Sequence, residues 1–495
     1  MTDTILPNTS GNSEHSLKPG VLGLFDSAIM GIAGSAPAYS ISATTLFLFA
    51  NVGFGGPASL LYCGFFMFGI VFAFNFLSKS DSTAGATYSW VRRALHPYLG
   101  YLAGWALIVS ALIFMVIATF PAGSNILDIF RPSLASNKTL ITILGAVFFL
   151  LMVAAVAAGV TVTVTVQIIM SCIEIALLLL FAGLAIFHAH VVPFSWHWFS
   201  PSIFNTIHGN TFFAGALLAA FYYWGWDVTA NLNEETKDPG ANKVKMSQTS
   251  TSGLGGILGT IVVFLLFEVF TIASNMVIPA KDMGTNSPYS ADILAHLGQI
   301  VAPGWFGKFI VVSVLLSTIA TLETTLIQVT RTLFSMGRDK TLPAALGRVH
   351  HQRRTPIVAT VTVTVISLAL FVASQYIGSV YNILQDGYSA IGIQICIYYA
   401  LAGFSVIVLY RRQLFKSVKN FIFMGLWPLL GALFMTVVFF KVIPPLNVTT
   451  KVVGLGSMAL GLIPMAYYAW KKAPYFDLPT KEDRHAILQE IQQNL

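Results

Sequence analysis

Long apolar stretches, each about long enough to cross a bilayer as a helix, follow one another along almost the whole chain. Short polar segments separate them. This alternation predicts an all-α polytopic membrane protein with twelve transmembrane helices. The predicted spans are residues 21–49, 55–77, 97–121, 139–159, 164–188, 209–233, 251–278, 306–336, 357–377, 380–409, 420–441 and 452–470.

Composition supports this class of protein. Of the 495 residues, 56% are hydrophobic and 9% are charged, and the mean hydropathy is +0.75. Globular domains usually carry about 25% charged residues. We therefore expect most of the surface to contact lipid and no sizeable soluble domain. The polar segment 1–20 has no apolar core, so no cleavable signal peptide is expected before the first span.

The formal net charge of +7 would by itself be compatible with a nucleic-acid partner. The positions of the basic residues indicate a membrane protein instead. When the loops between the spans are assigned alternately to two sides, 21 of the 27 Lys and Arg residues fall on the side of the N-terminus. This bias is typical of cytoplasmic loops. We therefore expect a multi-pass protein of the cell membrane, surrounded by lipid, with both termini cytoplasmic and no nucleic-acid partner.

Small and polar residues interrupt the first span between Gly31 and Ser40. Pro37 lacks a backbone N–H and clashes with the carbonyl four residues earlier, so the helix must bend or open nearby. Backbone groups freed in this way persist at membrane depth only beside protein or a watery cavity. The segment therefore predicts either half of a solute site or a packing kink.

The sixth span contains a second anomaly, between Phe221 and Pro239. Aromatic residues surround Gly225, and Asp227 follows two positions later. A carboxylate in the bilayer costs at least about 2.5 kcal/mol, so we expect Asp227 to face the interior and to have a partner. Interrupted first and sixth helices are what an inverted repeat of five spans plus five predicts, with the site where the breaks meet.

Nothing in the sequence indicates a metal site, a cofactor or a catalytic dyad. The three cysteines lie inside predicted spans, and His188, His190 and His197 have no carboxylate nearby. We therefore expect no cofactor, no metal and no enzymatic activity. A membrane sensor or a membrane-embedded enzyme stays a distant alternative.

Three separated motifs resemble those of the amino acid–polyamine–organocation permeases. They are Ala84 to Ala94 with Gly100 to Trp105 at the third span, Gly225-Trp226-Asp227 followed by Asn233 to Glu235 and Asp238-Pro239, and Arg331 followed by Arg338 to Pro343 and Thr355-Pro356. The resemblance implies a leucine-transporter-like fold with helices 1 and 6 broken. The implied units are a tail 1–20, a first repeat 21–190, a second repeat 205–410, two further helices within 415–472 and a tail 473–495.

The resemblance also implies how a solute is held. In such permeases, backbone N–H groups at the first break hold the carboxylate of an amino acid, and carbonyls of the sixth span hold its amine. An aromatic residue of the sixth span, here Trp224 or Trp226, is the expected lid. The candidate substrate-binding residues are Ile32, Ala33, Gly34, Ser35, Ala36, Tyr222, Tyr223, Trp224, Gly225 and Trp226.

Two acids in the spans are candidates for ion coupling. Glu174 lies where several proton-coupled relatives carry a lysine, and Glu323 lies on a span with many hydroxyl residues. Glu174 could carry a proton or bind a cation, either sodium or a protonated amine. Glu268 and Asp386 are expected either to form structural hydrogen bonds or to bind substrate.

Four charged residues in or next to the spans are candidate gates. They are Asp26, Arg92, Asp227 and Glu234. Lys79, Arg92 and Arg93 are expected either to pair with Glu234 and Glu235 or to form a separate solvated cluster.

Together these features predict a secondary active transporter that imports an amino acid or a related small amine by alternating access. Proton symport is the expected coupling. The alternative within transport is an exchanger of amino acids, amines or polyamines, for which the acids in the spans would suit a cationic solute.

Overall fold

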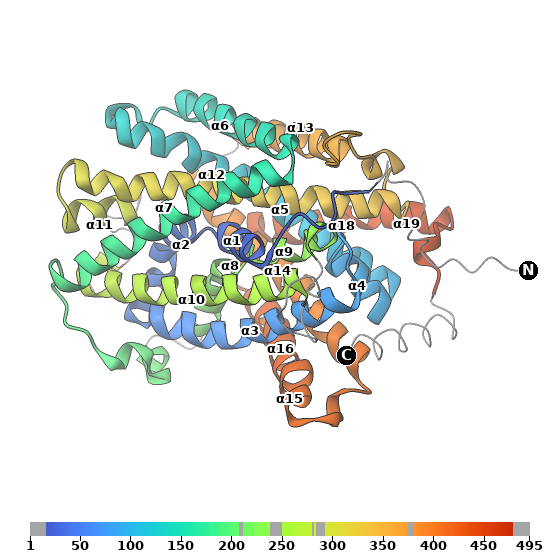
Figure 1. Cartoon of the computed structure of the whole chain (residues 1–495). Coiled ribbons are helices and arrows are strands. Elements are labelled where there is room, and N and C mark those ends of the chain that lie inside the picture. Colours follow the sequence, from blue (N-terminus) through green and yellow to red (C-terminus); the bar gives the residue numbers. More distant parts are fainter. Residues whose placement is uncertain are drawn as a thin grey trace, which may run out of the picture.

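The computed structural model describes residues 16–206, 211–237, 250–279, 282–283, 293–374, 376 and 380–478. Most of the predicted tails, 1–20 and 473–495, therefore lies outside the described residues. Within these ranges the chain is helical, apart from an isolated β-bridge between Leu22 and Thr236. Long helices run roughly side by side, and the two described chain ends lie toward the same end of the bundle (Figure 1). We call this end the terminal end, and the other the opposite end.

The first half of the bundle contains the helices α1 (Leu24–Ser35), α2 (Pro37–Val52), α3 (Gly56–Ser80), α4 (Thr87–Ala94), α5 (Pro97–Phe130), α6 (Lys138–Ala158) and α7 (Val160–Phe187). The second half contains α8 (Thr211–Tyr222), α9 (Val228–Asn231), α10 (Thr251–Val277), α11 (Ile293–Val301), α12 (Trp305–Arg338), α13 (Ile357–Ser374), α14 (Val380–Tyr410), α15 (Val418–Asn420), α16 (Trp427–Val442), α17 (Val448–Lys451), α18 (Ser457–Leu460) and α19 (Leu462–Trp470).

Ten helical segments among the described residues are long and apolar enough to cross a membrane. A polytopic membrane protein is therefore confirmed, whereas twelve spans and the five-plus-five repeat stay predictions. Two features account for the lower number. The segment Leu24–Ser80 counts once although it contains α1, α2 and α3, and α8 is too short to count because the sixth predicted span breaks after Tyr222.

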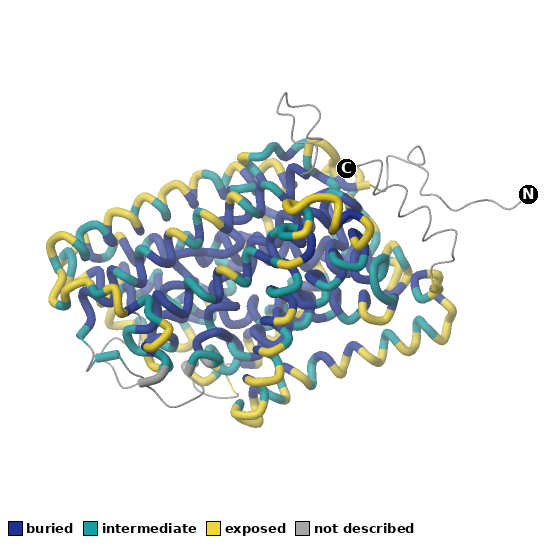
Figure 2. The backbone as a smooth tube through the Cα atoms, turned by 90° about the horizontal axis from the view of Figure 1, so that it is seen from below, coloured by how far each residue is buried: buried dark blue, intermediate teal, exposed yellow. Residues whose placement is uncertain are grey.

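Burial separates interior helices from peripheral ones. In the most apolar part of α12, 83% of the residues are buried, against 11% in the last span, Val448–Trp470. α6 and α13 lie side by side on one outer face (Figure 1). Exposed residues follow the outer surface and buried ones fill the interior (Figure 2). Because the exposed side chains of α6 and α13 are largely apolar, these helices are suited to contact lipid.

Candidate functional site

The first helix break lies where the sequence predicts it. α1 ends at Ser35, Ala36 takes a left-handed conformation with φ 46°, and α2 begins at Pro37. Proline suits the first position of a helix because it has no N–H to satisfy there. The chain is thus divided into two helices in the middle of the first predicted span.

The amides that this break frees are those of α2. Ala36 N–H donates to the Ile32 carbonyl (3.0 Å), and α1 stays helical through Ser35, so the amides of residues 32–36 belong to α1. A break exposes the last carbonyls of the preceding helix and the first amides of the following one. The substrate-binding role of Ile32 to Ala36 stays a prediction, and in this conformation the carbonyls of Gly34 and Ser35 at the end of α1 are better candidates than the amides.

The second break separates α8 from α9. Residues 223–227 between the two helices are non-helical, and Gly225 has φ 100°, which L side chains rarely adopt. Trp224 N–H donates to the Phe221 carbonyl (3.0 Å), and Val228 N–H donates to the Gly225 carbonyl (3.2 Å). The second predicted interruption is therefore also present.

The two breaks contact each other through their glycines. A Cβ atom added to Gly34 would lie 2.2 Å from the Gly225 carbonyl oxygen, and one added to Gly225 would lie 2.1 Å from the Gly34 oxygen. No side chain fits at either position without moving backbone. Thr321 of α12 donates to the Gly34 carbonyl (3.0 Å), which ties this junction to the interior helix.

Glu174 of α7 caps the N-terminus of α2. Its Oε1 atom accepts hydrogen bonds from Ala38 N–H (2.8 Å) and from the Ser317 hydroxyl (2.7 Å). Tyr39 N–H donates to the same hydroxyl (3.1 Å). A helix N-terminus carries a partial positive charge and favours an anion. In this conformation, an internal carboxylate occupies the amide end of the first break.

Glu323 lies on the same contact between α7 and α12. It accepts a hydrogen bond from Gln167, which also donates to the Ala320 carbonyl (3.0 Å). Glu174 and Glu323 are both buried, and within the described part of the chain one oxygen of each, Oε2 of Glu174 and Oε1 of Glu323, has no hydrogen-bond partner. Such oxygens are the atoms on which a proton or another cation would be stabilised.

Asp227 connects the second break to two interior helices. Its carboxylate accepts from Gln328 (2.8 Å), Tyr398 (3.0 Å), Tyr399 (3.1 Å) and the Gly225 amide (3.3 Å). The expected interior partners are thus neutral donors from α12 and α14. Burying a carboxylate costs less free energy when it is hydrogen-bonded, so these contacts stabilise Asp227 at the start of α9. The gating role of Asp227 stays a prediction.

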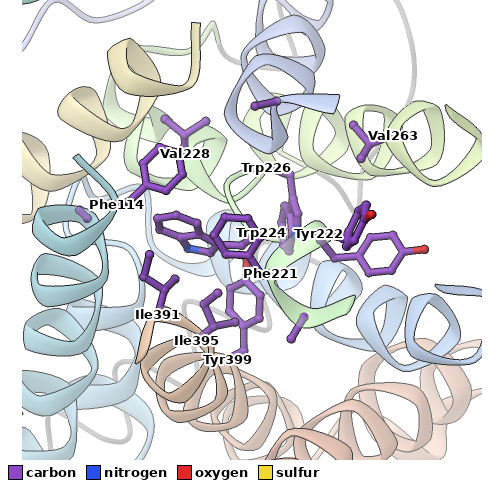
Figure 3. Packing of buried hydrophobic residues seen from close by; sticks show 14 of the residues in the cluster. Phe114, Phe221, Tyr222, Trp224, Trp226, Val228, Val263, Ile391, Ile395 and Tyr399 are labelled. Carbon is purple, nitrogen blue, oxygen red and sulfur yellow. The ribbon is translucent and has the colours of Figure 1, made fainter. Parts of the chain in front are cut away.

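The aromatic residues at the second break face different neighbours (Figure 3). Trp224 packs against Phe114 of α5 (centroids 5.2 Å apart) and donates to the Tyr398 hydroxyl (2.5 Å). Trp226 packs against Phe74 of α3 (5.0 Å). Of the two candidate lids, Trp224 is therefore the one that lies between the breaks and helices α5 and α14.

Tyr222 and Tyr223 direct their hydroxyls away from the break. Tyr222 shares a hydrogen bond with Thr45 of α2 (2.5 Å), and Tyr223 donates to the Leu60 carbonyl of α3 (3.0 Å). Only their backbone is therefore positioned to meet a solute between the breaks.

Ion pairs join the segment after α9 to α12 at the terminal end of the bundle. Glu235 and Arg331 form a buried two-pronged pair (2.7 and 3.1 Å) with both side chains 1% exposed. Glu234 pairs with Arg338 (3.0 Å) and accepts from Ala84 N–H (2.9 Å). Glu234 and Glu235 thus have arginines of α12 as partners, whereas Arg92 makes its contacts elsewhere.

Arg92 binds the C-terminal segment instead. It donates to the carbonyl of Tyr475 (2.7 Å), which lies in the short 3₁₀ helix η13 (Pro474–Phe476), and its guanidinium lies 4.8 Å from the centre of the Tyr475 ring. Burial raises the pKa of Tyr475, so its phenol stays protonated and donates to the Tyr88 carbonyl (2.9 Å). Asp26 accepts from Gly23 N–H (2.8 Å) at the start of α1, as a capping residue does.

Glu268 and Asp386 are the two remaining acids in the spans. Asp386 of α14 accepts from Asn447 (2.7 Å) and Thr450 (2.8 Å). Glu268 of α10 is buried, and neither carboxyl oxygen has a hydrogen-bond partner among the described residues. No set of three or more His, Cys, Asp or Glu residues that could hold a metal ion occurs in the part of the chain that the structure describes.

Several residues at the site were not identified from the sequence. They are Tyr39, Phe114, Gln167, Gln328, Tyr388, Tyr398 and Tyr399. The available signal was polarity inside an apolar span, which Gln167, Gln328 and the pair Tyr398-Tyr399 each show. That signal marks a buried polar group but does not name its partner.

A bundle of membrane-spanning helices with two broken helices meeting in its interior is the architecture of a multi-pass transporter. The sequence model of the family "Amino acid permease" matches residues 22–463, and the chain belongs to this family. Permeases are transporters, not enzymes.

Individual relatives carry different solutes. The chain is 26% identical to the branched-chain amino acid permease BcaP of Bacillus subtilis over 377 residues, 72% of this chain and 74% of the relative. It is 27% identical to the serine/threonine exchanger SteT of the same organism over 402 residues, 78% and 82% of the two chains. It is 24% identical to the low-affinity putrescine importer PlaP of Escherichia coli over 302 residues, 59% and 61%.

Proposed function

We propose that this protein is a twelve-span secondary permease that imports an amino acid or a related small amine across the cell membrane, by alternating access and with proton symport. The terminal end faces the cytoplasm, in agreement with the bias of Lys and Arg residues. The observation that carries the proposal is the contact between the two helix breaks at Gly34 and Gly225, beside the buried acids Glu174 and Asp227.

The ends of the broken helices supply the groups that recognise an amino acid. The carbonyls at the end of α1, those of Gly34 and Ser35, carry a partial negative charge suited to an amine. The amides of Ala38 and Tyr39 at the start of α2 suit a carboxylate. Trp224, held by Phe114 and Tyr398, covers the solute as the lid.

Proton coupling follows from competition for the α2 amides. Glu174 occupies the Ala38 amide in this conformation. A proton on Glu174 removes its negative charge and weakens that hydrogen bond, so the carboxylate of the solute can take the amide. Release of the proton on the other side of the membrane lets Glu174 return and displace the solute. Glu323, with one unpartnered oxygen on the same helix contact, is the proposed second carrier.

Uptake into proteoliposomes tests the function. The purified protein is reconstituted and given labelled L-leucine, L-serine, L-histidine or putrescine, with and without an inwardly directed proton gradient. We expect the gradient to accelerate uptake of at least one of these solutes. Uptake that does not depend on the gradient but requires solute inside the vesicle would indicate the alternative, an exchanger. The exchanger is the second candidate because the relative SteT is one.

Glu174→Gln tests the coupling residue. Glutamine keeps the size of the side chain but cannot carry the proton, so we expect gradient-dependent uptake to fall at least tenfold while expression stays normal. Glu268→Gln is the matched control because Glu268 is equally a buried carboxyl but lies on α10 and, among the described residues, accepts no hydrogen bond from the α2 amides. Normal pH dependence in Glu174→Gln, or its loss only in Glu268→Gln, would remove Glu174 from this role.

A further inference from the structure

A cavity of about 280 Å³ lies toward the opposite end of the bundle. It is bounded by α2, α8, α14 and the end of α16, so two of its walls are the half-helices that lead from this end to the breaks. Its lining includes Phe47, Asn51, Phe213, Gln385, Tyr388 and Lys441. We call this cavity the vestibule. Pockets for drug-sized ligands are about 300–1,000 Å³, so the vestibule suits a solute of amino-acid size.

A single aromatic layer separates the vestibule from the breaks. Tyr388 lines the vestibule, and its hydroxyl is hydrogen-bonded to that of Tyr39 on α2 (3.1 Å). The Tyr388 ring packs against Phe221 (centroids 4.9 Å apart), which lies in the last turn of α8. Phe221 in turn packs against the lid residue Trp224 (6.2 Å). The side chains of Tyr388, Phe221 and Trp224 therefore separate a solute in the vestibule from the site at the breaks.

The vestibule carries one positive charge. Lys441 is the charged residue among those that line it, and Asn51, Gln385 and Ser389 supply neutral polar groups. The acid next to this lining, Asp386, accepts hydrogen bonds from Asn447 and Thr450 with its Oδ1 atom. Lys441 is exposed, and a lysine that lines a cavity attracts anionic groups and raises their local concentration.

We propose that the vestibule is a second, transient solute site in which Lys441 binds the carboxylate of an incoming amino acid before Tyr388 and Phe221 move aside. The proposal rests on the proposed transport function. It adds a recognition step that distinguishes an amino acid from an amine without a carboxylate, because Lys441 attracts the first and repels the second. Amino acids are thereby favoured over polyamines at entry.

Lys441→Met tests this step by uptake kinetics. We expect the half-saturating concentration of labelled L-leucine to rise about tenfold, with the maximal rate within twofold of wild type, because the charge acts on capture and not on the later steps. Inhibition by isoamylamine, which is leucine without its carboxylate, should be unchanged or stronger. L-Histidine and histamine provide a second pair of the same kind.

Lys138→Met is the matched control, since Lys138 begins α6 and does not line the vestibule. An unchanged half-saturation in Lys441→Met, an equal change in Lys138→Met, or an equal loss for isoamylamine and leucine would overturn the proposal.

A thiol-protection experiment tests the vestibule without relying on transport. Ser389→Cys is introduced together with Cys172→Ser, because Cys63 and Cys396 are buried whereas Cys172 is exposed. We expect L-leucine or L-histidine to slow modification of the introduced thiol by a water-soluble maleimide, putrescine not to slow it, and Lys441→Met to abolish the protection. Absence of wild-type uptake with intact protection would refute the proposed transport function alone. Absence of protection by either amino acid would refute the vestibule site.

Discussion

At the scale of single residues, glycine decides whether the two breaks can meet. Gly34 and Gly225 approach so closely that a methyl group on either would overlap a backbone oxygen of the other. Gly225 additionally has φ 100°, which costs an L residue conformational energy. The contact therefore depends on the absence of a side chain and not on a chemical group.

Gly34→Ala should separate the breaks and reduce initial uptake at least tenfold, because the added Cβ meets backbone that cannot rotate away. Gly183→Ala in α7 is the control, since nothing lies within 4 Å of its added Cβ and alanine favours a helix by up to about 1 kcal/mol. Both variants are compared by uptake and by size-exclusion chromatography. Wild-type uptake by Gly34→Ala would show that the tight contact is dispensable.

At the scale of elements, ion pairs of different burial join the segment after α9 to α12. The pair of Glu235 with Arg331 is almost completely buried, whereas in the pair of Glu234 with Arg338 the arginine is 45% exposed. Removing one partner of a buried pair costs about 3–5 kcal/mol because a charge is left without compensation. An exposed pair contributes about 0.2–1 kcal/mol.

Glu235→Gln should therefore lower the thermal unfolding temperature of the purified protein far more than Glu234→Gln does. Replacing both buried partners, with Arg331→Met and Glu235→Leu, should recover part of the loss because no unpaired charge remains. Thermal unfolding in detergent measures all three variants. Equal losses for the two single substitutions would show that the burial of the pair is not what matters.

At the scale of the whole molecule, the two ends of the bundle differ. The terminal end is closed by the ion pairs, by backbone bonds from Val21 and Leu22 to the Glu235 carbonyl, and by η13 packed on α4. The opposite end contains the vestibule. A transporter with alternating access must open each end of the bundle in turn. The contacts that close the terminal end therefore have to be separable.

The C-terminal segment provides one such contact. Tyr475 stacks on Tyr88 (4.5 Å), is 3% exposed and is held by Arg92. Tyr475→Ala should cost about 3–5 kcal/mol, as for other large buried aromatic residues, and lower the unfolding temperature. Tyr475→Phe, which removes only the bond to the Tyr88 carbonyl, should cost about 0.5–1.5 kcal/mol. Equal unfolding temperatures for the two variants would contradict a role for the ring packing.

The sequence by itself determined the class of the protein and the position of both helix breaks. Hydrophobic stretches identify membrane helices because lipid allows few alternatives to them. Pro37 and Gly225 mark the breaks because proline and glycine act on the local backbone. The expectation that the amides of residues 32–36 hold a carboxylate illustrates the limit of such local reasoning. The end of α1 stays helical, so the amides that the break frees are those of α2.

Only the tertiary structure decided which side chains meet. The Glu174 carboxylate and the Ala38 amide lie 136 positions apart in the sequence. Asp227 accepts hydrogen bonds from Tyr398 and Tyr399, which lie more than 170 positions away. The polarity of each residue predicts that it needs a partner, but many partners satisfy that need equally well. The packing of α7, α12 and α14 around the two breaks selects among them, because only there do donor and acceptor come within hydrogen-bonding distance.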